Sequence, residues 1–272
     1  MLVPNTLRDN YVVAFFDVDG TLVERLVDSH VLDGKPSDAV CAAVRKFVEA
    51  GNVALLSTGR GPRAILSNLR ELPFSGMVAM DGAYVEVGGE VVVDAVLSDE
   101  AVQSILDFVE AENLVAGFDG LRDSFSVSPD GSWQGAQNDF SSVAEARAGL
   151  PRPCVEKANL LVPEKEQLQS LVGAGELFEL YDAGGRAYEA VALGVSKATG
   201  MRAALEALPG KHGLVLGLGD SENHLDMLAA CDVAIAMGNA REGVQAAADL
   251  VVADVVHDGV AEALARTHLL WE

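Results

Sequence analysis

The sequence is poor in basic residues: 19 lysines and arginines stand against 41 aspartates and glutamates, which gives a formal net charge of −22. No stretch of the chain gathers lysine and arginine into a basic patch. A field of this sign repels polyanions unless a bound cation or a local basic site reverses it. We therefore expect no nucleic-acid partner.

Cysteine and long apolar runs are also scarce. Cys41, Cys154 and Cys231 are odd in number and far apart, which argues against disulfides or a zinc ribbon and indicates a reducing compartment. No apolar run approaches the roughly 18 residues of a membrane helix, and the N-terminal "MLVPNTLRDN" lacks the pattern of a signal peptide. We expect a cytoplasmic protein without a membrane partner, and the sequence leaves its oligomeric state open.

Three common motifs of nucleotide and ester chemistry are missing. "GLGDSE" carries Glu222 where a dinucleotide-binding fingerprint needs its third glycine. The chain has neither a GxxxxGK[ST] phosphate loop nor a GxSxG nucleophile elbow. Dinucleotide enzymes, P-loop enzymes and serine esterases are therefore not indicated.

Apolar residues are plentiful, at 50% of the chain, and they are arranged in short buried runs that alternate with helical patterns. A helix is expected over residues 37–50, with Ser37 as N-cap and Gly51 as C-cap, and another over 196–208. Strands are expected at "YVVAFF" (11–16), "NVALLS" (52–57), "GLVLGLG" (213–219) and "DVAIAM" (232–237). This alternation predicts an α/β protein with a Rossmann-like, doubly wound, mostly parallel sheet.

The middle of the chain has a different pattern. "AYVEVGGEVVVDAV" is typical of a hairpin that turns at Gly88 and Gly89, and a helix and weaker strand-like segments follow it. The polar, glycine-rich stretch over 127–142 is expected to be a loop. We predict an α+β domain at residues 84–190, inserted into a core formed by residues 1–83 and 191–272.

"FFDVDGTLV", residues 15–23, places Asp17 and Asp19 directly after the first buried strand. Ligands of open α/β sheets bind beyond the carboxyl ends of the strands, which is where these two carboxylates are expected. A calcium loop of the EF-hand type is excluded, because Leu22 stands where glycine is required and Asp28 where a bidentate glutamate is required. A turn without a functional role is the remaining alternative for a DxDG sequence taken alone.

Three further motifs lie at predicted strand or helix ends. "STGR" (57–60) offers a hydroxyl and exposed backbone N–H groups that can hold phosphate oxygens. Lys197 lies at a helix start, where a cation opposes the helix dipole, so it is either solvated or used to neutralise phosphate. "LGLGDSENHLDML" (216–228) places Asp220 at the end of a strand and Asn223 in the first turn of a helix.

Taken in order, "DVDGT", "TGR", "GVSK" and "GDSENHLDML" resemble the haloacid dehalogenase superfamily of phosphatases, and the insert resembles the large cap of its Cof-type sugar-phosphatase branch. The resemblance covers nearly the whole chain. It implies a Rossmann-like core, a mobile cap that sets specificity for the leaving group, and a magnesium-dependent hydrolase of a small phosphorylated metabolite that forms an aspartyl-phosphate.

The resemblance also implies roles for individual residues. Asp17 would be the nucleophile, and Asp19 would protonate the leaving oxygen and then deprotonate water. Mg²⁺ would be held by Asp17, the backbone carbonyl of Asp19, and Asp220. The substrate's phosphoryl group and its surroundings would be contacted by Thr58, Gly59, Arg60, Lys197 and Asn223.

Two positions depart from the family pattern. His224 replaces the usual final aspartate of the fourth motif, which leaves two outcomes open: weaker Mg²⁺ binding, or a shift toward Mn²⁺ or Co²⁺. Asp81 stands before Gly82, where relatives usually have asparagine. Two other functions stay open beside hydrolysis: transfer of the phosphoryl group to a hydroxyl acceptor, as in a mutase, and phosphate-ligand binding without turnover.

Overall fold

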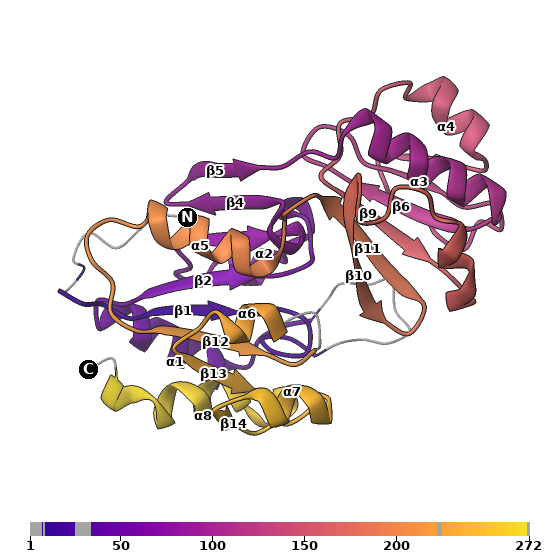
Figure 1. Cartoon of the computed structure of the whole chain (residues 1–272). Helices are drawn as coiled ribbons and strands as arrows, with labels where there is room; N and C mark the ends of the chain where they lie inside the picture. The colour runs from indigo at the N-terminus through magenta and orange to yellow at the C-terminus, as the bar shows by residue number, and fades with distance from the viewer. Residues whose placement is uncertain (1–6, 8, 25–33, 222–224, 271–272) are drawn as a thin grey trace. The chain divides into compact units, whose positions relative to one another are not determined.

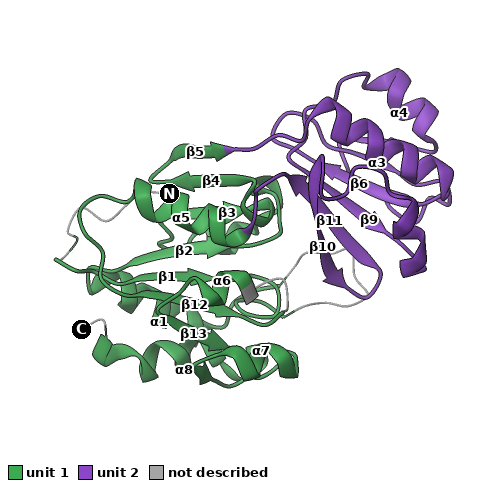
Figure 2. Ribbon diagram, viewed as in Figure 1, with its two compact units in different colours: residues 1–93, 197–272 green, residues 94–196 purple. Residues whose placement is uncertain are grey.

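The computed structural model describes residue 7 and residues 9–24, 34–221 and 225–270. The chain divides into two compact units, the first formed by residues 1–93 and 197–272 and the second by residues 94–196 (Figure 2). Among the described helices, none combines the length and the apolar character that a bilayer crossing requires.

Unit 1 is built on an eight-stranded sheet in the order β14-β13-β12-β1-β2-β3-β4-β5 (Figure 1). From β14 to β3 neighbouring strands are parallel, and β4 runs antiparallel to β3. The strands are β1 (Val13–Phe16), β2 (Val53–Ser57), β3 (Gly76–Ala79), β4 (Tyr84–Val87), β5 (Glu90–Asp94), β12 (Val215–Gly219), β13 (Val233–Ala236) and β14 (Leu250–Val251). The predicted α/β class with a mostly parallel sheet is confirmed.

Helices cover both faces of this sheet. On one face α1 packs against α8, and on the other α5 packs against α6 and the strands. The helices of this unit are α1 (Asp38–Glu49), α2 (Ser67–Arg70), α5 (Lys197–Ala207), α6 (Leu225–Ala229), α7 (Glu242–Ala247) and α8 (Gly259–Arg266). The Ser37 hydroxyl caps α1 by accepting a hydrogen bond from the Val40 amide at 3.1 Å, as the sequence predicts.

Strand β1 is buried on both faces because its side chains alternate between the two helical layers. Val13 and Phe15 belong to the cluster under α5 and α6, whereas Phe16 packs edge-on against Phe47 of α1 at a ring-centroid distance of 6.5 Å. Burying side chains of this size stabilises the fold by about 1.5–3 kcal/mol each. The apolar run therefore fixes the position of the residue that follows it, Asp17.

Unit 2 contains a six-stranded sheet in the order β10-β11-β9-β6-β7-β8, with helices α3 and α4 packed on it. Its core includes Phe118 and Phe125, cross-strand neighbours whose rings stack with centroids 4.3 Å apart. The elements are α3 (Asp99–Ala111), β6 (Val115–Asp119), β7 (Phe125–Val127), β8 (Asn138–Phe140), α4 (Val143–Gly149), β9 (Lys157–Leu161), β10 (Phe178–Gly184) and β11 (Ala187–Ala192).

The structure corrects two details of the expected insert. The predicted hairpin is present as β4 and β5, but β4 pairs with β3 and so belongs to the sheet of unit 1. Unit 2 therefore begins at Asp94 rather than at residue 84, and it ends at Ser196 rather than at residue 190. The expected loop over 127–142 includes the short strand β8, which pairs with β7.

A buried carboxyl group makes the stability of unit 2 dependent on pH. Glu156 is 1% exposed, and its Oε2 accepts a hydrogen bond from the Leu121 amide at 2.9 Å. Burial, followed by a hydrogen bond to Asp94, raises the pKa of Glu156 to about 7. The folded state thus holds this proton more tightly than the unfolded chain, so stability is lost as the pH rises from the ordinary glutamate value through about 7.

We expect Glu156→Gln to remove this part of the pH dependence, because the amide keeps the shape without ionising. Between about pH 5 and pH 8 the wild type should lose up to roughly 3 kcal/mol of unfolding free energy relative to the variant. Urea unfolding followed by circular dichroism across this range measures the difference. Glu166→Gln, at an exposed position of the same unit, should follow the wild type; equal slopes for all three proteins would contradict the assignment.

Candidate active site

The candidate site of unit 1 lies at the carboxyl ends of three neighbouring parallel strands, β12, β1 and β2 (Figure 1). Phe16, the last residue of β1, is in register with Leu56 of β2 and Leu218 of β12. The segments that follow these three residues therefore leave the sheet at the same edge. They carry the three motifs that contain Asp17, Thr58 and Asp220.

Asp17 is held at the end of β1 with almost no access to solvent. The residue is 3% exposed, and its backbone N–H donates to the Leu218 carbonyl at 3.0 Å. The Lys197 ammonium lies 4.0 Å from its Oδ1. A buried carboxylate beside a buried cation is suited to attack an anionic group, because the cation offsets the repulsion.

Gly20 brings the loop after β1 against the loop after β12. Its φ is +86°, and a Cβ atom placed on it would lie 2.1 Å from Oδ2 of Asp220. The Asn239 amide group donates to the Gly20 carbonyl at 2.8 Å, which fixes the turn from the side of β13. The glycine of the first motif is thus required by both its backbone conformation and the carboxylate that contacts it.

The donor set at this edge fits a hard divalent cation such as Mg²⁺. Asp17 and Asp220 supply two buried carboxylates from adjacent strands, and the absence of a Cβ at Gly20 makes room for the Asp220 carboxylate. Among the described residues, no group of three or more His, Cys, Asp or Glu side chains is arranged to hold a metal ion. Further ligands would therefore be backbone carbonyls and water, which Mg²⁺ commonly retains.

Asp19 is engaged by Arg60 through two parallel hydrogen bonds. Nε of Arg60 donates to Oδ2 at 2.8 Å and Nη2 donates to Oδ1 at 2.6 Å, while Nη1 donates to the Ala64 carbonyl at 3.2 Å. A two-point guanidinium–carboxylate contact fixes the orientation of both groups. The sequence placed Arg60 near the substrate but did not reveal this pairing, because the two residues are distant in the chain.

Thr58 and Gly59 form the loop after β2. Thr58 is 1% exposed, its amide donates to the Val78 carbonyl at 2.8 Å, and its hydroxyl accepts from the Arg60 amide at 3.1 Å. Thr58, Gly59 and Arg60 therefore belong to one ordered turn beside Asp17. A hydroxyl and backbone amides in such a turn are suited to binding phosphoryl oxygens.

Lys197, the first residue of α5, is buried rather than solvated, with 2% of its surface exposed. Its Nζ lies 3.6 Å from Oδ1 of Asp81, in addition to the contact with Asp17. Of the two roles left open by the sequence, the structure is consistent with the functional one, since a buried ammonium needs carboxylate or phosphate neighbours. Two other predicted residues, Asn223 and His224, lie outside the described residues.

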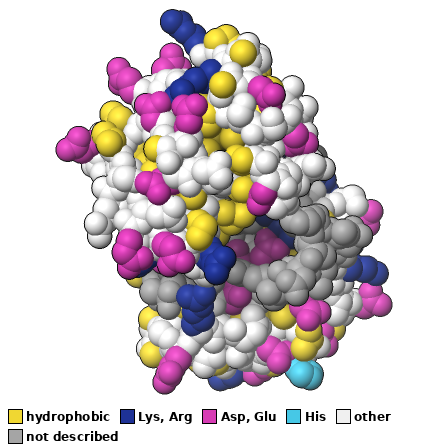
Figure 3. All heavy atoms as spheres, turned by 90° about the vertical axis from the view of Figure 1, so that its right-hand side faces the viewer, with side chains coloured by type: hydrophobic (Ala, Val, Ile, Leu, Met, Phe, Trp, Pro, Cys, Tyr) yellow, Lys and Arg dark blue, Asp and Glu magenta, His cyan; other side chains and the backbone are white. Residues whose placement is uncertain are grey.

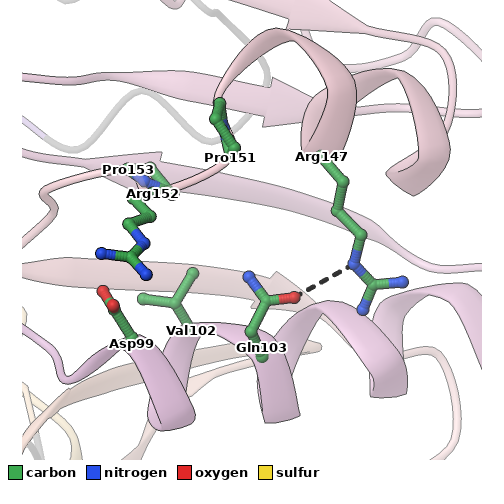
Figure 4. A pocket seen from close by; sticks show the side chains of 7 residues that line it. All are labelled: Asp99, Val102, Gln103, Arg147, Pro151, Arg152 and Pro153. Carbon is green, nitrogen blue, oxygen red and sulfur yellow. Dashed lines mark hydrogen bonds between the residues drawn. The ribbon is translucent and has the colours of Figure 1, made fainter.

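Unit 2 contains a separate pocket of about 310 Å³ between α3 and the segment after α4 (Figure 4). It is lined by Asp99, Val102, Gln103, Arg147, Pro151, Arg152 and Pro153. Arg147 donates to Gln103 at 3.1 Å and to Glu110 at 3.1 Å, and it also pairs with Asp107. These contacts explain Arg147 as a residue that fastens α4 to α3.

The acidic composition is evident on the surface. In the space-filling view, Asp and Glu side chains are scattered over the visible face, with fewer Lys and Arg side chains among them (Figure 3). In the part of the chain that the structure describes, the cations in contact with Asp17 and Asp19 are therefore significant for binding an anion. They are the buried Lys197 and the Arg60 guanidinium, whose side chain is 10% exposed.

Comparison with known proteins places this geometry in a family. The pattern of the haloacid dehalogenase-like hydrolases matches residues 14–264. YkrA of Bacillus subtilis (strain 168), named as a phosphatase, is 24% identical over 266 residues, covering 94% of this chain and 97% of its own. The HAD subclass IIB sugar phosphatase BT4131 has a TM-score of 0.78 and 26% identity, covering 94% of this chain and 99% of that chain. BT1666 from Bacteroides thetaiotaomicron shares the fold, with a TM-score of 0.77 and 22% identity over 98% of both chains.

Proposed function

The chain belongs to the haloacid dehalogenase-like hydrolase family, and we propose that it hydrolyses a phosphomonoester of a small metabolite through a phosphorylated Asp17. The observation that carries this proposal is the buried Asp17 carboxylate at the end of β1, with the Lys197 ammonium 4.0 Å away. The names of YkrA and of the sugar phosphatase BT4131, which both align along most of the chain, support a phosphatase and favour a sugar phosphate as substrate.

In the first step, a carboxylate oxygen of Asp17 attacks phosphorus and the bond from phosphorus to the leaving oxygen breaks. Asp19 gives its proton to that oxygen, so that an alcohol leaves. In the second step, Asp19 takes a proton from water, whose oxygen attacks the phosphorus of the aspartyl-phosphate. Inorganic phosphate leaves, and the Asp17 carboxylate and the protonated Asp19 are regenerated.

Thr58, Gly59, Lys197 and Asn223 are the proposed partners of the phosphoryl oxygens, because donors placed before the reaction stabilise its developing charge. Arg60 is proposed to contact the substrate beside them, sharing its guanidinium with Asp19. Asp17, the Asp19 carbonyl and Asp220 would hold Mg²⁺, which when bound neutralises part of the phosphoryl charge. Mn²⁺ or Co²⁺ is the alternative that His224 raises.

Two further assignments follow the resemblance. We propose that unit 2 acts as the cap that selects the leaving group. We also propose a cytoplasmic location, because the three cysteines, Cys41, Cys154 and Cys231, are all free thiols.

The direct test is a phosphate-release screen over phosphorylated metabolites with Mg²⁺, Mn²⁺ and Co²⁺ in turn, using Asp17→Asn as the blank. We expect free phosphate from at least one sugar phosphate without any added acceptor. Release that requires a hydroxyl acceptor would replace hydrolysis with phosphoryl transfer. Equal signals from wild type and blank throughout would overturn the proposal.

Replacing Asp19 with asparagine should separate the two chemical steps. p-Nitrophenolate leaves without protonation, so phosphorylation of Asp17 should survive, whereas hydrolysis of the aspartyl-phosphate lacks its base. We expect a burst of about one p-nitrophenol per active site, followed by turnover roughly 100-fold slower than the wild type. Rapid-quench kinetics measures both phases, and glycerol phosphate, whose alcohol needs a proton to leave, should give no burst.

A further inference from the structure

A strained turn, residues 80–82, joins the phosphate-binding loop to Lys197. Met80, Asp81 and Gly82 have φ values of +49°, +55° and +101°, the left-handed region that residues with a Cβ seldom occupy. Asp81 tolerates this conformation better than most residues, but a methionine rarely adopts it. Such a backbone persists only where its surroundings hold it in place, and it is often associated with a functional site.

The turn is held on one side by the loop after β2. The Met80 amide donates to the Arg60 carbonyl at 3.1 Å, and the Asp81 amide donates to the Thr58 carbonyl at 3.3 Å. Both acceptors belong to the motif proposed to bind phosphoryl oxygens. A displacement of the turn would therefore move the phosphate-binding loop with it.

On its other side the turn meets α5. A Cβ atom placed on Gly200 would lie 2.9 Å from Cα of Gly82, so the helix approaches the turn more closely than any other residue at position 200 would allow. This approach brings Lys197, one turn earlier in α5, to 3.6 Å from the Asp81 carboxylate. Both side chains are nearly inaccessible, at 2% and 5% exposure.

We infer that Asp81 is a positioning residue that acts through Lys197; this inference rests on the proposed function. Lys197 lies between two carboxylates, Asp17 and Asp81. Phosphorylation of Asp17 replaces the charge of its carboxylate with the charges of the phosphoryl group, whereas the Asp81 carboxyl takes no part in bond making or breaking. Asp81 therefore anchors the Lys197 ammonium from a side that does not change during the reaction.

This role gives a function to the carboxylate of Asp81, which stands where the family pattern has asparagine. Asparagine forms the same left-handed turn but carries no charge. Asp81→Asn therefore removes the anchor and leaves the backbone as it is. Asp81→Gly is the second variant, because glycine adopts the turn without strain and also lacks the carboxylate.

We expect both variants to lower kcat for p-nitrophenyl phosphate by about tenfold or more, because Lys197 is then misplaced. KM should change much less than kcat, because the loss of a negative neighbour favours anion binding and offsets the displacement of Lys197. A wild-type kcat in Asp81→Asn would overturn the inference and leave Asp81 as a turn-forming residue only. A loss of kcat confined to one of the two variants would also overturn it.

A stability cycle tests the same coupling without using activity. In the otherwise wild-type chain, Asp81→Asn should lower the melting temperature, because the buried Lys197 ammonium then has one counter-charge fewer. In a Lys197→Met chain the same change should leave the melting temperature unchanged or raise it, because it removes a buried carboxylate that has lost its cation. Equal shifts in the two backgrounds would show that Asp81 does not act through Lys197. This result stands even if no phosphatase activity is found, so it is separable from failure of the proposed function.

Discussion

Asp17→Asn is expected to abolish phosphate release, with kcat lowered by at least about 1,000-fold. An amide oxygen is a far weaker nucleophile than a carboxylate, and the variant also removes one of the two carboxylates proposed to hold Mg²⁺. Substrate binding should survive, because Thr58, Lys197 and the turn around Gly59 are unchanged. The loss should therefore appear in kcat rather than as a large rise in the dissociation constant of the substrate.

The experiment has two measurements. Steady-state phosphate release gives the loss of kcat, and acid quenching with a substrate labelled at phosphorus shows whether label stays on the protein. Wild type should retain label, and Asp17→Asn should retain none. Asp38→Asn makes the same chemical change at a side chain that is 99% exposed in α1 and should behave as wild type. Label trapped on Asp17→Asn would assign the nucleophile to another residue.

The part of the fold that the sequence predicted is the part governed by local pattern. β1, β2, β12 and β13 follow continuous apolar runs, because strands covered on both faces need no polar alternation. The hairpin of β4 and β5 was also predictable, but its partner strand was not. Pairing of β4 with β3 depends on long-range register, for which a hairpin sequence carries no signal.

The candidate site likewise has a part that the sequence predicts and a part that it does not. Asp17, Thr58 and Asp220 could be predicted because each follows a recognisable strand, and topology brings the ends of parallel strands together. The contacts of Arg60 with Asp19 and of Lys197 with Asp81 could not, because they join residues from different segments and depend on side-chain direction. The departure at Asp81 was visible in the sequence, but its partner became evident only from the packing of α5.

Gly20→Ala is expected to impair metal binding while leaving the proposed phosphate donors Thr58 and Lys197 in place. The new methyl group would lie 2.1 Å from Oδ2 and 2.6 Å from Cγ of Asp220. Asp220 is short and only 8% exposed, so its carboxylate cannot simply rotate into solvent. Either it turns away from Asp17 or the loop after β1 shifts, and both changes separate the two carboxylates proposed to hold Mg²⁺.

We expect the Mg²⁺ concentration for half-maximal activity to rise by about 10- to 100-fold in Gly20→Ala, comparable to the loss of a supporting residue in other metal sites.

Gly210→Ala is the control for backbone strain. Gly210 also has a positive φ, +75°, but a Cβ there meets nothing within 4 Å. That variant should lose stability by about 1–2 kcal/mol and keep the wild-type Mg²⁺ dependence. Calorimetric titration of Mg²⁺ into each full-length variant gives a readout besides activity. An unchanged Mg²⁺ affinity in Gly20→Ala would remove Asp220 from the proposed metal site, because the carboxylate would then have moved without consequence.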